Sequence, residues 1–266
     1  MSGQMTRQTE GNPDAREVVL AARNVAKSYG NVHALKGVNF DIHRGQVTTL
    51  FGENGAGKST LMKILSGVIQ PTTGQIILDG RPVSFANAND ARDRGISIIH
   101  QELSLAPNLS VRDNIFMGRE LRGPMGVDFA EEERQVRILM EELEEEIDPL
   151  TPVEELRLGQ QQIVEIARAL ALSPKILLLD EPAAGCNAVE TEEIDHLIAE
   201  VAKSGVAILL VEHDMKMVMR ISNHIVVLDH GEKIAEGDPA AVSRNPAVIA
   251  AYLGTDAGTE AAHADG

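Results

Sequence analysis

The sequence has few of the features that would place it in a membrane or outside the cell. It contains one cysteine, Cys186, which excludes an intramolecular disulfide framework and suits a reducing cytoplasm. No apolar run approaches the roughly 18 residues of a membrane-spanning helix, and residues 1–16 lack the apolar stretch of a signal peptide. We therefore expect a chain that neither enters nor spans a membrane by itself, with flexible segments at residues 1–16 and 255–266.

Basic residues are also scarce relative to acidic ones. The 266 residues include 24 Lys and Arg against 40 Asp and Glu, which gives a formal net charge of −16. The phosphates of nucleic acid would repel such a chain, so we expect no nucleic-acid partner. Apolar residues make up 43%, enough for one large α/β domain, which we place at residues 17–254.

A glycine-rich stretch lies between an apolar run at 47–51 and a helical run at 61–65, and it fits the phosphate-loop pattern G-x-x-x-x-G-K-[ST]. Its glycines allow backbone N–H groups to surround phosphate oxygens at the start of a helix. Lys58 would reach the β- and γ-phosphates and the Ser59 hydroxyl would bind Mg²⁺. A turn that merely ends a strand would not need this Lys-Ser pair. The predicted loop consists of Gly52, Glu53, Asn54, Gly55, Ala56, Gly57, Lys58, Ser59 and Thr60.

Polar residues follow three further apolar runs that we predict to be buried strands. Gln101 follows residues 96–99, the pair Asp180 and Glu181 follows 176–179, and His213 follows 206–211. In an open α/β sheet, ligands bind at the carboxyl ends of parallel strands. We expect Asp180 to supply a second Mg²⁺ contact and Glu181 to polarise a water molecule. A surface acid at 181 and a structural histidine at 213 are the alternatives.

The start of the domain does not follow this pattern of a buried strand followed by polar residues. Short strands are expected at 18–20 and 38–42, and Asp79-Gly80 predicts the turn of a hairpin. Tyr29 falls in the loop between the short strands, where it either stacks on an adenine ring or serves packing.

Between residues 102 and 158 we predict an all-helical insert. Ser110 with Asp113, and Asp128 with Glu131, are typical of helix starts. The second helix would bury a face that ends at Ile147 and expose its acidic residues to solvent, since no histidine accompanies them as a metal ligand. The buried face consists of Val136, Leu139, Met140, Leu143 and Ile147.

Five motifs in this order resemble the nucleotide-binding subunit of ATP-binding cassette (ABC) transporters. They are the phosphate loop, Gln101, a signature segment, the acidic pair at 180–181 and His213, and the resemblance covers roughly residues 18–253. It implies an α/β P-loop NTPase with a mostly parallel core sheet, an N-terminal antiparallel β subdomain and the inserted α-helical subdomain. The signature segment is Leu156, Arg157, Leu158, Gly159 and Gln160.

The resemblance also implies partners and roles. A second nucleotide-binding subunit, identical or different, would form a head-to-tail dimer that holds two ATP molecules with Mg²⁺ between phosphate loops and signature segments. Tyr29 would stack on adenine, Gln101 would couple the γ-phosphate and Mg²⁺ to the membrane subunit, Glu181 would be the catalytic carboxylate and His213 the switch histidine. The complex would lie on the cytoplasmic face of the inner membrane, with transmembrane permease subunits against the insert and, indirectly, a solute-binding protein.

One motif departs from the family pattern. The signature is typically Leu-Ser-Gly-Gly-Gln, whereas this sequence has Arg157 in place of the serine. The serine hydroxyl binds the partner's γ-phosphate. Arg157 would either make a charge-assisted contact instead or point away and weaken the closed dimer.

The transported solute is predicted less directly, because two parts of the chain resemble different branches. Residues 98–120 are similar to importers of simple sugars such as ribose, and the chain from residue 180 onward is similar to branched-chain amino-acid importers. We favour a sugar because the surface after Gln101 selects the permease; an amino-acid importer is the alternative. A soluble ABC ATPase of DNA repair or translation would carry a long coiled-coil insert or a second cassette.

Overall fold

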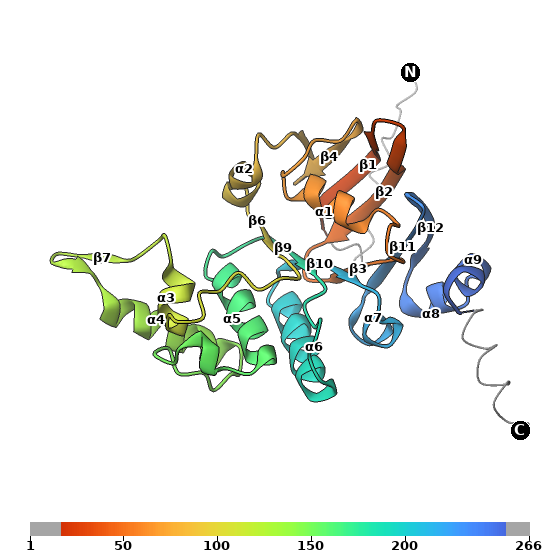
Figure 1. Ribbon diagram of the computed structural model, residues 1–266. Coiled ribbons are helices and arrows are strands. Elements are labelled where there is room, and N and C mark those ends of the chain that lie inside the picture. Colours follow the sequence, from red (N-terminus) through yellow and green to blue (C-terminus); the bar gives the residue numbers. More distant parts are fainter. Residues whose placement is uncertain (1–16, 254–266) are drawn as a thin grey trace, which may run out of the picture.

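A six-stranded sheet forms the centre of the computed structural model, which describes residues 17–253 (Figure 1). Its order is β12-β11-β3-β10-β9-β6, and every neighbouring pair is parallel except β11 with β12. The expected mostly parallel core sheet is therefore confirmed, while the segments predicted at 1–16 and 255–266 lie outside the described residues. The strands are β3 (Val47–Phe51), β6 (Ile96–Ile99), β9 (Ile176–Asp180), β10 (Ala207–Glu212), β11 (His224–Asp229) and β12 (Glu232–Gly237).

A second sheet has four antiparallel strands in the order β2-β1-β4-β5, and these strands come both before and after β3 in the sequence. The prediction of short strands here was wrong, because β1 pairs with β2 from Val18 to Tyr29 and with β4 from Leu20 to Ala26. This pairing provides hydrogen-bond partners for the backbone beyond the short apolar run at 18–20. Tyr29 consequently ends a strand and does not lie in a loop. The strands are β1 (Val18–Tyr29), β2 (Val32–His43), β4 (Thr73–Leu78) and β5 (Arg81–Val83).

The predicted hairpin is present between β4 and β5. Asp79 and Gly80 have φ of 49° and 74°, the left-handed pair that a two-residue type I′ turn requires. The strong local preference of Asp-Gly for this turn explains why the sequence alone placed it.

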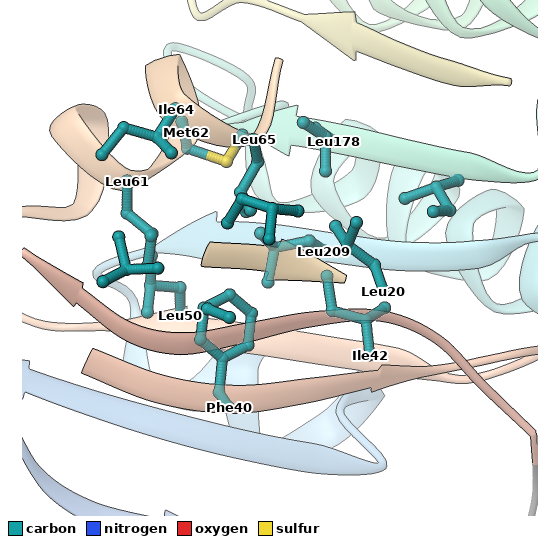
Figure 2. Close-up of a cluster of buried hydrophobic side chains, with 14 of the residues drawn as sticks. Leu20, Phe40, Ile42, Leu50, Leu61, Met62, Ile64, Leu65, Leu178 and Leu209 are labelled. Atoms are coloured by element: carbon teal, nitrogen blue, oxygen red, sulfur yellow. The ribbon is translucent and has the colours of Figure 1, made fainter. Parts of the chain in front are cut away.

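Helix α1 (Lys58–Leu65) packs between the two sheets and fixes the position of the phosphate loop that precedes it. Figure 2 shows its Leu61, Ile64 and Leu65 meeting side chains from both sheets. Leu20 lies on the antiparallel side and Leu209 on the parallel side of the same fully buried cluster. Because the helix is held on two sides, the loop at its start is attached to a rigid element.

The opposite face of the parallel sheet is covered by a second buried cluster. The insert emerges from this side and extends away from the C-terminal helices (Figure 1). The helices that contribute to this cluster are α3 (Val111–Phe116), α4 (Phe129–Glu142), α5 (Leu158–Leu170), α6 (Ala188–Lys203) and α7 (Met215–Ile221). A short helix, α2 (Ala88–Asp93), leads into β6 on the other side.

The insert corrects two sequence predictions. It is not all-helical, because Gly123, Pro124 and Gly126 prevent a continuous helix, and β7 (Arg122–Gly123) pairs with β8 (Gly126–Val127). Helix α4 ends at Glu142, before Ile147, because Glu144 takes a left-handed φ of 58°. Ile147 is nevertheless buried in the same cluster. A 3-10 turn (Val153–Glu155) then closes the insert.

The predicted helix starts are confirmed. The Ser110 side chain accepts the N–H of Asp113, and Asp128 accepts that of Glu131. Each bond satisfies a backbone donor that the helix itself leaves unpaired.

The chain ends on the outer strands of the parallel sheet. Helices α8 (Pro239–Ser243) and α9 (Pro246–Val248) and the π-helical turn η2 (Ile249–Leu253) form a third buried cluster with β11, β12 and Phe51. Between residues 17 and 253, we find no helix with the length and apolar character needed to cross a membrane.

Candidate active site

The phosphate loop connects β3 to α1, and two of its glycines are required by the space around them. A Cβ atom at Gly52 would lie 2.5 Å from the carbonyl oxygen of Leu228. At Gly57, where φ is 105°, a Cβ atom would lie 2.7 Å from the carbonyl oxygen of Ala34. Gly55 has φ of 88° with open space around it. The loop thus has close backbone packing beneath it and an unobstructed outer side.

The loop also offers hydrogen-bond donors. Within residues 17–253, no acceptor meets the N–H groups of Asn54, Gly55 and Gly57, whereas Ala56 donates to Glu53 at 3.1 Å. Unpaired N–H groups beside a helix N-terminus favour an anion. The loop therefore fits the phosphates of a nucleotide by its donors as well as by its sequence. Ser59 is exposed at the start of α1, and Thr60 is half-buried behind it.

Lys58 lies beneath these donors with its side chain buried. Its Nζ donates to the carbonyl oxygens of Gly52 at 2.5 Å and Glu53 at 3.0 Å. Burial lowers the pKa of Lys58, and the carboxylates of Glu181 and Asp180, followed by those of Glu212 and Glu53, oppose this shift. The expected proximity of the phosphate loop to the ends of β9 and β10 is therefore found in the structure.

Three predicted site residues meet at the edge of the sheet. Gln101 Nε2 donates to Glu181 Oε2 at 3.1 Å, and His213 Nδ1 lies 3.4 Å from Glu181 Oε1. These residues follow β6, β9 and β10, which are neighbours in the sheet. The sheet topology thus brings together side chains that are far apart in sequence, and Glu181 is at their centre. Their catalytic roles remain predictions.

Glu181 itself has an unusual backbone. Its φ is 49°, a left-handed conformation that a non-glycine residue seldom adopts, and its N–H donates to Val211 at 3.0 Å. Such conformations cost free energy and cluster at functional sites. The side chain is only 16% exposed, so the carboxylate is held in a defined position.

Two more carboxylates lie close by. Burial, and secondarily the charge of Glu181, raises the pKa of Asp180. Burial likewise raises the pKa of Glu212, which accepts the N–H of His213 at 3.2 Å. Sequence reasoning assigned no role to Glu212, although an acid at the end of a buried strand was a visible signal.

The signature segment lies elsewhere on the chain. Leu158 begins α5, and Arg157 is the residue before it, whose backbone N–H donates to Gln160 at 3.2 Å. A Cβ atom at Gly159 would lie 2.9 Å from Glu190 Cβ, so only glycine allows α5 to approach α6 this closely. Leu156 packs at the edge of the second cluster.

No hydrogen bond or ion pair among residues 17–253 joins the signature segment to the phosphate loop of the same chain. Arg157 instead lies beside two acids. Its Nη2 is 3.9 Å from Glu193 Oε2. Burial, followed by the charge of Glu193, raises the pKa of Glu145, and the charge of Arg157 opposes this shift. Because the Arg157 side chain is 59% exposed, this pairing is weak.

Tyr29 is 49% exposed at the end of β1. The Nζ atom of Lys27 lies 5.3 Å from its ring centroid. An exposed aromatic ring of this kind is available for stacking, and its exposure weighs against a purely packing role.

A pocket opens between the phosphate loop and the turn from β10 to α7. Its lining includes Glu53, Asn54, His213, Lys216 and Tyr252. Sequence reasoning gave Tyr252 no part in the site, because nothing in the local pattern links the end of the chain to this loop.

Comparison with known proteins identifies the family. The model of the ABC transporter family matches residues 35–184. The chain belongs to this family. A second model, that of the branched-chain amino acid ATP-binding cassette transporter, matches residues 232–258.

Solved structures share the fold. A nucleotide-free ATP-binding cassette from an ABC transporter superposes with a TM-score of 0.78 at 27% identity, covering 88% of this chain and 98% of that one. The cassette cbiO1 from Clostridium perfringens, part of the ABC transporter complex cbiONQ, superposes with a TM-score of 0.77 at 30% identity. This match covers 88% of this chain and 94% of that one. The predicted P-loop NTPase fold is confirmed.

Among curated relatives, the ribose import ATP-binding protein RbsA of Rhodopirellula baltica is 45% identical over 241 residues, which are 90% of this chain and 47% of that protein. The arabinose import ATP-binding protein AraG of Yersinia pestis is 41% identical over 92% of this chain and 47% of its own length. The chain therefore spans about half the length of the curated relatives it matches.

The raised pKa of Glu212 predicts a pH-dependent stability. An acid whose folded-state pKa exceeds its unfolded value destabilises the fold as pH rises through the folded pKa. Glu212→Gln still accepts the His213 N–H but cannot ionise. Urea denaturation near pH 8 should therefore give a larger unfolding free energy for the variant than for the wild type. The difference between the two free energies should shrink toward about pH 4. The exposed acid variant Glu102→Gln is the control, and a margin that grows on acidification would contradict the interpretation.

Proposed function

We propose that this chain is the ATP-binding and ATP-hydrolysing subunit of an ABC importer for a simple sugar. The observation that carries the proposal is the convergence of Gln101 and His213 on the Glu181 carboxylate, beside the phosphate loop that holds Lys58. This arrangement places a carboxylate and a cation in one site, as hydrolysis of a phosphoanhydride requires.

In this proposal each group has a distinct task. The free N–H groups of the loop bind phosphate oxygens, and Lys58 exchanges its carbonyl partners for the β- and γ-phosphates. Glu181 accepts a hydrogen bond from the attacking water and polarises it toward the γ-phosphate. Gln101 and His213 hold the carboxylate from either side, so that the water is aligned when the nucleotide binds.

The donor set near the loop fits Mg²⁺ in its usual form. Among residues 17–253 there is no cluster of three or more His, Cys, Asp or Glu side chains of metal-binding geometry. Mg²⁺ bound with ATP keeps waters and phosphate oxygens as ligands and needs few from the protein. Ser59, Gln101 and Asp180 would hold it, and it would neutralise charge on the phosphates.

Hydrolysis in this proposal requires a second subunit, because the signature segment does not reach its own phosphate loop. We infer a head-to-tail dimer, homo- or heteromeric, in which Arg157 and its neighbours in the signature segment face the partner's nucleotide. Release from Glu193 would leave the Arg157 guanidinium free for the γ-phosphate, a charge-assisted contact in place of the usual serine hydroxyl.

Sugar is preferred as the solute because the likeness to sugar importers extends over most of the chain. The ribose and arabinose import relatives match about nine-tenths of it, including the insert and the segment after Gln101. The branched-chain amino acid model matches only residues 232–258, and the described part of that range, residues 232–253, lies at the opposite end of the molecule from the insert (Figure 1). An amino-acid importer remains the second candidate because of this match.

The importer subunit would lie on the cytoplasmic face of the membrane, bound to transmembrane permease subunits. The insert offers a surface for them. A pocket there is lined mainly by apolar residues of α3, α4 and the turn after α5, among them Phe116, Leu139 and Leu172. The buried Nη1 atom of Arg119 at this pocket has no hydrogen-bond partner among the described residues. A permease segment with a carboxylate would satisfy it.

The first test of this proposal removes the catalytic carboxylate. Glu181→Gln keeps the shape and the Gln101 contact but is a poorer base, so turnover of MgATP should fall at least about 100-fold while the dissociation constant stays within about twofold. The variant should accumulate as an ATP-bound dimer. Lys58→Ala should instead lose nucleotide affinity. Near-normal hydrolysis by Glu181→Gln would remove this carboxylate from the mechanism.

The second test concerns the signature segment. Arg157→Ser should leave MgATP affinity of the isolated monomer unchanged, because Arg157 makes no contact with its own phosphate loop, and should alter only ATP-dependent dimerisation or turnover. Glu193→Gln is the matched control, since it frees Arg157 without changing the signature. A large loss of ATP affinity in monomeric Arg157→Ser would show that Arg157 serves its own site.

The third test concerns the solute. The chain should co-purify with a sugar permease, and the matching sugar-binding protein should stimulate its ATP hydrolysis. Exchanging residues 101–150 for the corresponding segment of an amino-acid importer should switch the permease and preserve basal hydrolysis, because the hydrolytic carboxylate lies outside that segment. Co-purification of the unmodified chain with a branched-chain amino-acid permease alone would refute sugar import.

A further inference from the structure

The last residue of β3, Phe51, is packed against the C-terminal part of the chain. It belongs to a buried cluster with Val242 of α8 and Val248 of α9, and not to the clusters that surround α1 and the insert. The ring of Tyr252 meets the Phe51 ring edge-on, with centroids 5.1 Å apart and an interplanar angle of 71°. The strand therefore delivers the chain into the phosphate loop at a point that the C-terminal turn supports.

The Tyr252 hydroxyl makes two polar contacts there. It donates to the Leu228 carbonyl at 2.8 Å and accepts the N–H of Glu53 at 3.4 Å. Leu228 is the residue whose carbonyl oxygen lies against Gly52, the first residue of the loop. One hydroxyl group thus joins the end of β11 to the second residue of the phosphate loop.

Glu53 occupies a central place in the loop backbone. Its carbonyl oxygen accepts from Lys58 Nζ at 3.0 Å and from the N–H of Ala56 at 3.1 Å. Its N–H is directed to Tyr252, whereas the N–H groups of Asn54, Gly55 and Gly57 meet no acceptor among the described residues. The peptide unit that Tyr252 contacts therefore also carries the Gly52 carbonyl, which accepts from Lys58 Nζ at 2.5 Å, and the next peptide unit carries the Glu53 carbonyl.

We propose that Tyr252 is a positioning residue for the phosphate loop, which its hydroxyl anchors through the Glu53 amide. Nucleotide affinity then depends on the C-terminal turn, although that turn lies outside the matched ABC transporter region, residues 35–184. The consequence for ATP rests on the proposed function, whereas the anchoring of the loop does not.

The environment of Tyr252 suits this role. Burial raises the pKa of its hydroxyl, so the proton that bonds Leu228 stays in place across the neutral range. The turn that carries it is supported by two proline-started helices, α8 and α9, whose N-terminal residues Asp238 and Asn245 accept backbone N–H groups. The hydroxyl is therefore presented from a supported segment.

Hydrogen–deuterium exchange on the nucleotide-free full chain tests the anchor directly. Tyr252→Phe removes the hydroxyl and keeps the ring, so exchange of the peptide covering residues 52–57 should accelerate at least about threefold, with α5 unchanged. In a MgATP titration the dissociation constant should rise about fivefold, the effect of one hydrogen bond. Ser243→Ala is the control, because among residues 17–253 that hydroxyl bonds only the Ala240 carbonyl within α8.

The two measurements separate this inference from the proposed function. Unchanged exchange of residues 52–57 in Tyr252→Phe overturns the anchor, whatever the affinity. Acceleration only in Tyr252→Leu, which also removes the ring, overturns the role of the hydroxyl in favour of packing. Faster exchange in Tyr252→Phe, in a chain whose wild type binds no MgATP, supports the anchor and overturns the proposed function.

Discussion

The burial of the Lys58 ammonium is the constraint on which the rest of the site depends. A buried cation is costly unless hydrogen bonds and opposite charges compensate it. Two loop carbonyls and the carboxylates at the ends of β9 and β10 supply that compensation here. The parallel sheet is needed because it brings these strand ends beside the loop. Helix α1, packed between the two sheets, holds the lysine close to them.

The same compensation explains how the site can respond to a nucleotide. Lys58 bonds carbonyl groups of its own loop, and Glu181 is held by Gln101 and His213. Phosphates offer the lysine a stronger partner than neutral carbonyls do. Nucleotide binding would therefore relieve the contacts of Lys58 and rearrange the groups around Glu181, and in the proposed dimer the signature segment of a second subunit would close the site.

The sequence was most informative where chemistry is local. The Asp79-Gly80 turn and the starts of α3 and α4 depend on a few adjacent residues, and each was predicted correctly. The strand and the helix expected on either side of the glycine-rich loop are also present, while phosphate binding by the loop stays a prediction. The long β1 strand was missed because pairing with β2 and β4 extends it past polar residues such as Arg23 and Lys27. The hairpin in the insert and the early end of α4 were missed because the prediction used the spacing of apolar residues. That spacing does not show where a residue such as Glu144 takes a left-handed backbone conformation. Tyr252 could not be found from the sequence, since its contact with Glu53 exists only through the fold.

A crystal structure of the chain with Mg²⁺ and a non-hydrolysable ATP analogue tests the central claim most directly. The account predicts that Lys58 Nζ leaves the Gly52 carbonyl for a phosphate oxygen, and that the γ-phosphate faces the Glu181 carboxylate. A nucleotide bound with Lys58 still on both loop carbonyls, or bound away from the ends of β9 and β10, would contradict it.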